Sequence, residues 1–279
     1  MFGLERTLKT LPYHVHHIGL TSLTYSTIFW VLSPVASAKL FSVYRKSPRR
    51  TQINWNVRVV SLIQSIFICG SAICVILSDK SRVQSDVRSR LLGYSPMAAR
   101  VQASAAGYFL WDILVSVLYL PILGPSSFIH GVCALSITML GFYPFANYYG
   151  INFVLYELST PFLNIHWFMD KSGLTGSTWQ LINGICLMGT FFASRIGWGL
   201  YQSFNLYRDI WTLWRIDPAS KTGLEAIGTT HDASSVSKWL SLTFLAANTI
   251  LSGLNIYWFG RMVKSMRGHF QNDNDHKEK

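Results

Sequence analysis

Apolar stretches of about 20 residues recur along the whole of this 279-residue chain, and no other feature constrains its fold as strongly. An α-helix of that length spans the hydrocarbon core of a bilayer. Half of the residues are hydrophobic and 13% are charged, whereas a soluble domain carries about 25% charged residues. We therefore predict an all-α, polytopic membrane protein.

About seven transmembrane helices are predicted from these stretches. They cover roughly residues 18–41, 57–78, 101–123, 128–142, 145–168, 179–204 and 239–263. The basic segment 79–100 is long enough for a helix in the membrane interface, and residues 208–238 are expected to form a solvated loop. We divide the chain into an N-terminal segment with the first helix (1–53), a membrane domain (54–264) and a polar, disordered tail (265–279).

The net charge of +11 does not indicate nucleic-acid binding, because the basic residues gather at the ends of the apolar stretches. Such positions lie close to anionic lipid headgroups. We expect membrane lipids as partners and no nucleic acid. Membrane orientation stays open, since the first two loops each carry four basic residues, and the oligomeric state stays open as well.

A histidine cluster near the N-terminus, "HVHH" at residues 14–17, is a candidate for metal binding. Metal sites in proteins usually combine histidine with cysteine or carboxylate ligands, and none of these lies nearby in the sequence. We therefore expect an interfacial cluster and no metal cofactor.

The fifth predicted helix carries a glutamate near the middle of the membrane. Glu157 lies about 12 residues from the start of that helix, or roughly 18 Å at 1.5 Å per residue. In a continuous α-helix, Glu157, Thr160 and Asn164 share one face, and Ser159 lies beside the opposite, apolar face. Pro161 has no N–H, which would leave the carbonyl of Glu157 free and kink the helix.

A carboxylate at that depth must be protonated or paired with a cation. The candidate cations for Glu157 are Arg195 in the sixth helix and His130 near the start of the fourth. Asp112 in the third helix is a further ionisable group that should face the bundle interior. We expect the asparagines of the last two helices mainly to form contacts between helices; they are Asn183, Asn248 and Asn255.

The segment "YELSTPFLNIHWF" (156–168) resembles the hallmark segment of TLC-domain proteins (TRAM–Lag–CLN type), particularly the small members that contain only this domain. Supporting segments occur in the family's order between residues 54 and 264: "WNVRVVSLIQS", "GYFLWD", "FIHG", "FFASRIGW" and "NIYWFGRM". The resemblance implies a six-helix bundle around a lipid-accessible cavity in the endoplasmic reticulum membrane. Lys277 in the terminal "HKEK" matches half of a dilysine retrieval signal, which also points to the endoplasmic reticulum.

The ceramide synthases of this family transfer an acyl chain from acyl-CoA to a sphingoid amine. They use paired histidines in one helix, and a His-Asp pair followed by a further Asp in a later helix. This chain resembles them in part. Only His130 stands in the paired-histidine region, and Glu157 stands near the Asp of His-Asp. Tyr156 and Thr160 occupy the positions of the remaining histidine and aspartate, so we expect no ceramide synthesis.

Three functions stay open. The favoured one is lipid handling or lipid homeostasis that affects membrane phospholipid composition. The second is an acyl-CoA-dependent lipid acyltransferase, with His130 as general base, Glu157 orienting it, acyl-CoA as co-substrate and no other cofactor. The third is a cargo or folding receptor of the early secretory pathway. The residues expected to line a cavity are Thr160, Asn164, Asp112 and Arg195.

Overall fold

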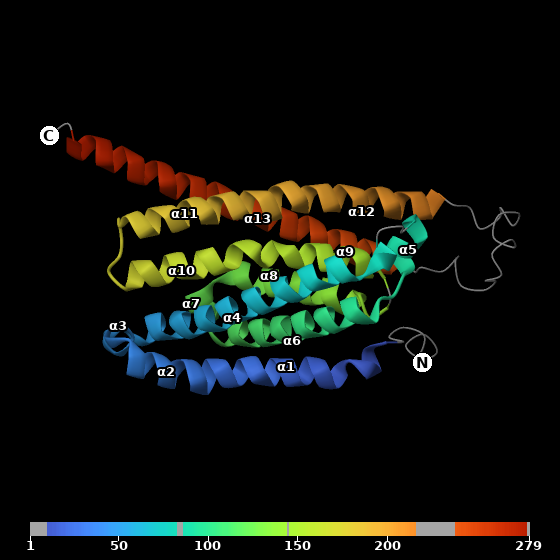
Figure 1. The fold of residues 1–279 in the computed structure, drawn as a ribbon, viewed down its shortest axis with the longest axis horizontal. Helices are drawn as coiled ribbons and strands as arrows, with labels where there is room; N and C mark the ends of the chain where they lie inside the picture. The colour runs from blue at the N-terminus through green and yellow to red at the C-terminus, as the bar shows by residue number, and fades with distance from the viewer. Residues whose placement is uncertain (1–9, 83–85, 144, 216–237, 278–279) are drawn as a thin grey trace, which may run out of the picture.

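The protein is a bundle of helices that run along one common direction (Figure 1). This computed structural model describes residues 10–82, 86–143, 145–215 and 238–277, and within these ranges there is no strand. Helices suit a bilayer because each one satisfies its backbone polar groups internally. Four helices among the described residues are long and apolar enough to cross a membrane: Val15–Leu40, Arg49–Ser78, Pro96–Leu118 and Trp239–Ser265.

The first half of the chain forms three long helices and several short ones. The chain enters through the short turn η1 (Leu11–Tyr13), and its first long helix comprises α1 (Val15–Thr27), the π-helix η2 (Ile28–Leu32) and α2 (Ser33–Leu40). Short α3 (Ser42–Lys46) leads into α4 (Arg49–Ser78), and the predicted interfacial segment contains η3 (Lys80–Arg82) and α5 (Val87–Leu92). Next come α6 (Pro96–Leu118), α7 (Leu120–Leu123) and α8 (Pro125–Leu140).

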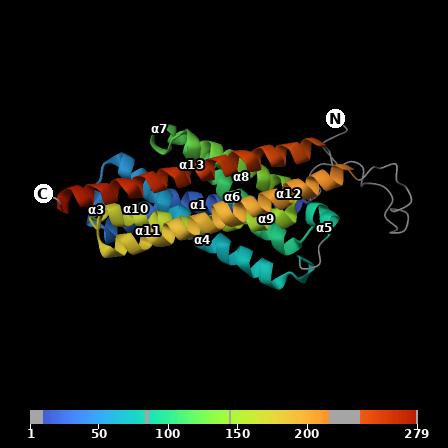
Figure 2. The same ribbon diagram turned by 90° about the horizontal axis from the view of Figure 1, so that it is seen from above.

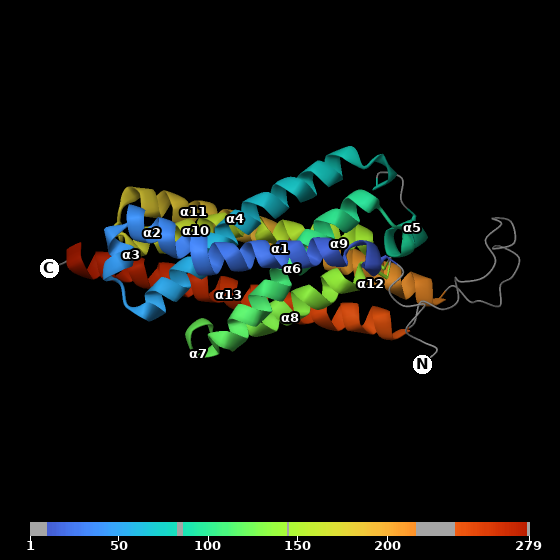
Figure 3. The same cartoon turned by 90° about the horizontal axis from the view of Figure 1, so that it is seen from below.

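The second half contains two long segments that are interrupted near their middle. The first consists of α9 (Asn147–Val154), the 3₁₀ helix η4 (Leu155–Ser159) and α10 (Thr160–Lys171). The second consists of α11 (Thr178–Phe191), the π-helix η5 (Phe192–Gly197) and α12 (Trp198–Arg215). Helix α13 (Lys238–Lys277) runs along the bundle, and its C-terminal end projects beyond the other helices (Figures 1, 2 and 3).

Helix α6 lies at the centre of the first half and packs against both α1 and α8. Small side chains allow this close packing, as is usual between helices in membranes. A Cβ atom on Gly107 would lie 2.6 Å from the backbone oxygen of Ile18, so α1 and α6 approach each other here backbone to backbone. The buried alanines of α6 are Ala98, Ala99, Ala103, Ala105 and Ala106.

The structure differs from the sequence predictions at the chain end and in one loop. Helix α13 continues as far as Lys277, into the segment 265–279 that was predicted as a polar, disordered tail. The predicted loop 208–238 begins later, because α12 continues to Arg215; the rest of that prediction, residues 216–237, lies outside the described residues.

The extension of α12 carries a buried carboxylate that fastens α5 and α9 to it. Asp209 is fully buried, and its Oδ2 accepts a hydrogen bond from Nε of Arg90 at 2.6 Å. The same oxygen accepts a hydrogen bond from the hydroxyl of Tyr149 at 2.5 Å. Arg208, whose side chain is 57% exposed, lies 3.7 Å away from Oδ1 of Asp209. Helix α5 is thus held to the bundle by charge as well as by packing.

We predict that Asp209→Ala lowers the free energy of unfolding by about 3 kcal/mol, because Arg90 and Tyr149 lose their shared acceptor. Denaturant unfolding of the purified protein in detergent measures this. Arg208→Ala is the matched control and should change the value by less than about 1 kcal/mol, since its charge is largely exposed. Equal small effects of both variants would show that the buried contact contributes little.

Candidate functional site

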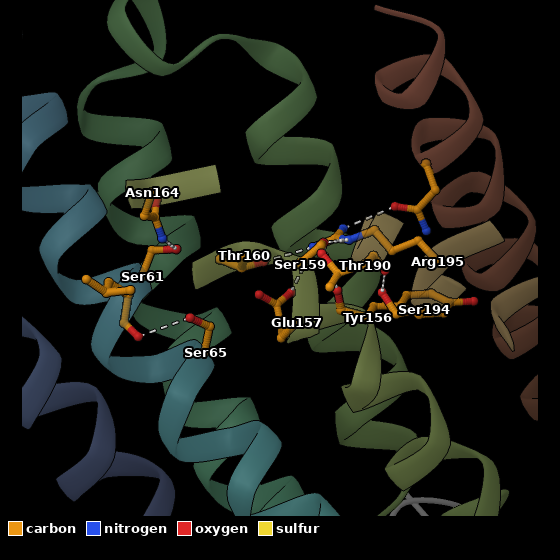
Figure 4. A network of polar contacts seen from close by, with 12 residues as sticks. Ser61, Ser65, Tyr156, Glu157, Ser159, Thr160, Asn164, Thr190, Ser194 and Arg195 are labelled. Atoms are coloured by element: carbon orange, nitrogen blue, oxygen red, sulfur yellow. Dashed lines mark hydrogen bonds and ion pairs between the residues drawn. The ribbon is translucent and has the colours of Figure 1, made fainter. Parts of the chain in front are cut away.

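The guanidinium of Arg195 is the centre of a polar network inside the bundle (Figure 4). Its Nε donates a hydrogen bond to Oγ of Ser159 at 3.0 Å, and Nη2 donates to Oγ1 of Thr160 at 3.0 Å. Nη1 donates to Oδ1 of Asn255 in α13 at 3.1 Å. The network therefore joins η5, α13 and the junction of η4 with α10.

Glu157 in η4 is the counter-ion of Arg195. Its Oε1 lies 3.6 Å from Nη2 of Arg195, and only 13% of its side chain is exposed. At this separation the two groups attract each other as charges, while the hydrogen bonds of the guanidinium go to neighbouring residues. Of the two cations that the sequence offered for Glu157, the structure therefore pairs it with Arg195.

The backbone around Glu157 differs from the predicted α-helix. Residues Leu155–Ser159 form a 3₁₀ helix, and the N–H of Thr160 donates to the carbonyl of Glu157. The prediction that this carbonyl is left free was therefore wrong, because Thr160 supplies the donor that Pro161 lacks. The 3₁₀ helix also turns about 120° per residue, which brings Ser159 to the interior; it is fully buried, not beside the apolar face.

The π-helix η5 turns Arg195 toward η4. Asn183 in α11 donates from Nδ2 to the carbonyl of Phe162 at 2.9 Å, so its side of α11 faces α10. Arg195 follows Asn183 by 12 positions, which would rotate it about 120° away in a regular α-helix. A π-turn contains one extra residue, so these 12 positions rotate the chain only about as far as 11 positions of a regular α-helix. The angle about the helix axis between Asn183 and Arg195 therefore falls to about 20°.

A pocket lies beside this network. Residues of α4, α6, α8, α9, η4 and α13 line it. His130 and Glu157 both contribute to this lining, which contains no lysine or arginine. The remaining walls are mainly apolar and include Ile68, Phe109, Phe153 and Leu251.

His130 packs against aromatic rings at this pocket. Its ring centroid lies 6.0 Å from that of Phe109 and 5.5 Å from that of Trp258. Its Nδ1 is buried and has no hydrogen-bond partner among the described residues. Among the described residues, the side-chain hydrogen bonds of Ser136 and Thr138 stay inside α8, and Ser127 donates to the carbonyl of Leu123 in the adjacent α7. Helix α8 is thus held to α6 and α13 by packing.

The other candidate residues lie between helices. Asn164 accepts a hydrogen bond from Nη1 of Arg58 at 3.2 Å and donates to Oγ of Ser61 at 3.1 Å, which ties α10 to α4 (Figure 4). Asp112 lies where α6 meets α8, since a Cβ atom on Gly131 would be 3.1 Å from its Oδ2. Thr160, Asn164, Asp112 and Arg195 are not among the residues that line the described pocket.

The N-terminal histidines lie apart from this site and contact α6 and the loop before it. Nε2 of His14 lies 3.0 Å from the hydroxyl of Tyr94, and Nε2 of His17 lies 3.0 Å from Oγ of Ser104. Both rings therefore take part in contacts within the protein.

Sequence reasoning missed the part played by Ser159 and underrated Asn255, which it treated only as a contact between helices. Both accept hydrogen bonds from Arg195. Ser159 was missed because α-helical periodicity assigns it to a position beside the apolar face. Its place inside the hallmark segment was the one sequence feature that could have indicated its role.

Comparison with known proteins gives matches over most of the chain. Residues 54–264 match the model of the TLC domain family. A TLC domain-containing protein from Schizosaccharomyces pombe is 38% identical over 95% of this chain and 82% of its own length. The Saccharomyces cerevisiae protein named Topoisomerase I damage affected protein 4 is 28% identical, over 90% and 84% of the two chains. TLC domain-containing protein 4 from Homo sapiens is 25% identical, over 89% and 86%.

We predict that Arg195→Leu lowers the free energy of unfolding by about 3–5 kcal/mol, because it leaves Glu157 buried without a counter-ion. The double variant Arg195→Leu/Glu157→Leu should lose less than this. Denaturant unfolding in detergent compares the variants, with Lys171→Leu as the control for an exposed ion pair. A loss in the double variant equal to or larger than that in Arg195→Leu would show that the two charges are not coupled.

Proposed function

Because this chain belongs to the TLC domain family, we propose that it is a membrane protein that handles lipids and influences phospholipid composition. The single observation that carries this proposal is the mainly apolar pocket beside the Arg195–Glu157 pair. An apolar pocket with a few polar groups takes up a molecule that is itself mainly apolar. In a membrane, lipids are the most abundant molecules of that kind.

The proposal includes a finer topology. The interrupted segments 147–171 and 178–215 would also cross the membrane, giving about seven passes around a lipid-accessible cavity. In support of this, both segments run alongside the other long helices (Figure 1). The two breaks are also joined to each other, because Arg195 donates side-chain hydrogen bonds to Ser159 and Thr160.

We propose that the protein resides in the endoplasmic reticulum, as the family resemblance implies. The names of these relatives refer to a TLC domain or to topoisomerase I damage and mention no lipid. The proposal of lipid handling therefore rests on the pocket.

We predict that Ala134→Phe reduces the lipid that stays bound during purification, because the new ring fills the pocket that Ala134 lines. Mass spectrometry of lipid extracted from the detergent-purified protein measures this. The matched control is Ile129→Phe, which adds the same ring at a 42% exposed position of the same helix. Both variants should elute as the wild type does in size-exclusion chromatography.

Equal lipid retention in both variants would contradict a lipid-binding pocket. A protein partner bound in stoichiometric amount, with no retained lipid, would instead favour the cargo or folding receptor function.

One observation favours a second function, acyl transfer. His130 and Glu157 line the same pocket, and Nδ1 of His130 is free of hydrogen-bond partners within the described residues. In this reaction His130 would take the proton of a lipid hydroxyl as that oxygen attacks the thioester carbonyl of acyl-CoA. The acyl group then forms an ester with the lipid, and the thiolate of CoA leaves and is protonated.

If the protein is an acyltransferase, His130→Ala should reduce transfer from radiolabelled acyl-CoA to a panel of acceptor lipids by about 100-fold or more. Thin-layer chromatography of the products from purified protein measures this. Ile129→Ala, on the same helix and partly exposed, is the control. Unchanged turnover in His130→Ala, or none in the wild type, would leave lipid handling without acyl transfer.

A further inference from the structure

The pocket contains a polar side chain that no described residue satisfies. Asn248 of α13 lines the pocket and is 1% exposed. Both its amide nitrogen and its amide oxygen lack a hydrogen-bond partner among the described residues. Leaving two such atoms buried and unpaired costs free energy, and a ligand that pairs with them would recover it.

Most other polar groups of the pocket are already occupied. Oε1 of Gln64 accepts a hydrogen bond from the hydroxyl of Tyr25, and Oγ1 of Thr138 donates to carbonyls of its own helix. Glu157 is paired with Arg195. The buried groups left to a ligand are therefore the amide of Asn248, the hydroxyl of Tyr156 and the ring of His130.

The electrostatics of the pocket oppose an anionic headgroup. No lysine or arginine lines it, and the nearby Arg195 directs its nitrogens to Ser159, Thr160 and Asn255. A phosphate needs several charge-assisted donors, usually from arginine, and here it would also meet the carboxylate of Glu157.

We propose that this pocket binds an uncharged lipid whose hydroxyl or amide group pairs with Asn248 while its apolar chain fills the rest. A hydroxyl or a secondary amide offers both a donor and an acceptor, which matches the two free atoms of the asparagine amide. The apolar walls at Ile68, Phe109 and Leu251 accommodate the chain. This inference rests on the proposed function and adds the chemical class of the lipid.

Monoolein and oleoyl lysophosphatidic acid test the inference, because both have the same acyl chain and glycerol and differ in the phosphate. The full-length chain in detergent solution is titrated with radiolabelled monoolein, and unlabelled lysophosphatidic acid is used as the competitor. We expect monoolein to bind and lysophosphatidic acid to compete at least about tenfold more weakly than unlabelled monoolein. Asn248→Leu should weaken monoolein binding by about tenfold, the loss of two hydrogen bonds.

Ser241→Ala is the matched control. Ser241 lies on the same helix, is fully buried and also lacks a hydrogen-bond partner in the described part of the chain, but it does not line the pocket. Its removal should leave monoolein binding unchanged. Without lipid, neither variant should lower the unfolding temperature, because neither side chain loses a partner; a lowered temperature in Asn248→Leu would mean a structural role and would overturn the inference.

The outcomes separate this inference from the function on which it rests. Tighter binding of lysophosphatidic acid, or unchanged binding of monoolein in Asn248→Leu, overturns the uncharged class and leaves lipid handling intact. Failure of both lipids to bind, while lipid still co-purifies with the wild type, also overturns the inference alone. Failure of both lipids together with no co-purified lipid overturns both proposals.

Discussion

The buried pair of Arg195 and Glu157 is the interaction on which the middle of this bundle depends. A guanidinium in a low-dielectric interior must have its donors occupied and its charge compensated. Here Ser159, Thr160 and Asn255 accept the hydrogen bonds and Glu157 supplies the charge. Because these partners come from separate helices, the position of one side chain fixes how three segments meet.

The same pair also connects the fold to the proposed chemistry. By holding Arg195 outside the pocket lining and pairing it with Glu157, the structure gives the pocket a polar edge with little net charge. Both helix breaks serve this arrangement: the 3₁₀ helix turns Ser159 inward, and the π-helix turns Arg195 to meet it. Irregular backbone here is therefore a means of placing side chains.

The sequence predicts the helical membrane fold, the interfacial helix and the importance of Glu157, because hydropathy and an isolated charge are local signals. It also provides Arg195 as one of two possible counter-ions. The sequence does not show which cation pairs with Glu157, because the pairing depends on the π-helix that turns Arg195 inward. No single residue type predicts a π-helix. Buried Asp209 was missed for a similar reason: its partners Arg90 and Tyr149 come from remote parts of the chain, and its own neighbourhood is polar.

Within the described residues, α8 makes no side-chain hydrogen bond to α6 or α13, so the walls of the pocket are held in two different ways. The η4 wall is anchored by directional contacts to Arg195, so moving it means breaking them. The α8 wall, which carries His130 and Ala134, contacts α6 and α13 through packed side chains that can slide past one another. Shear of this one helix against a fixed wall would change the width of the pocket without breaking a side-chain hydrogen bond to α6 or α13.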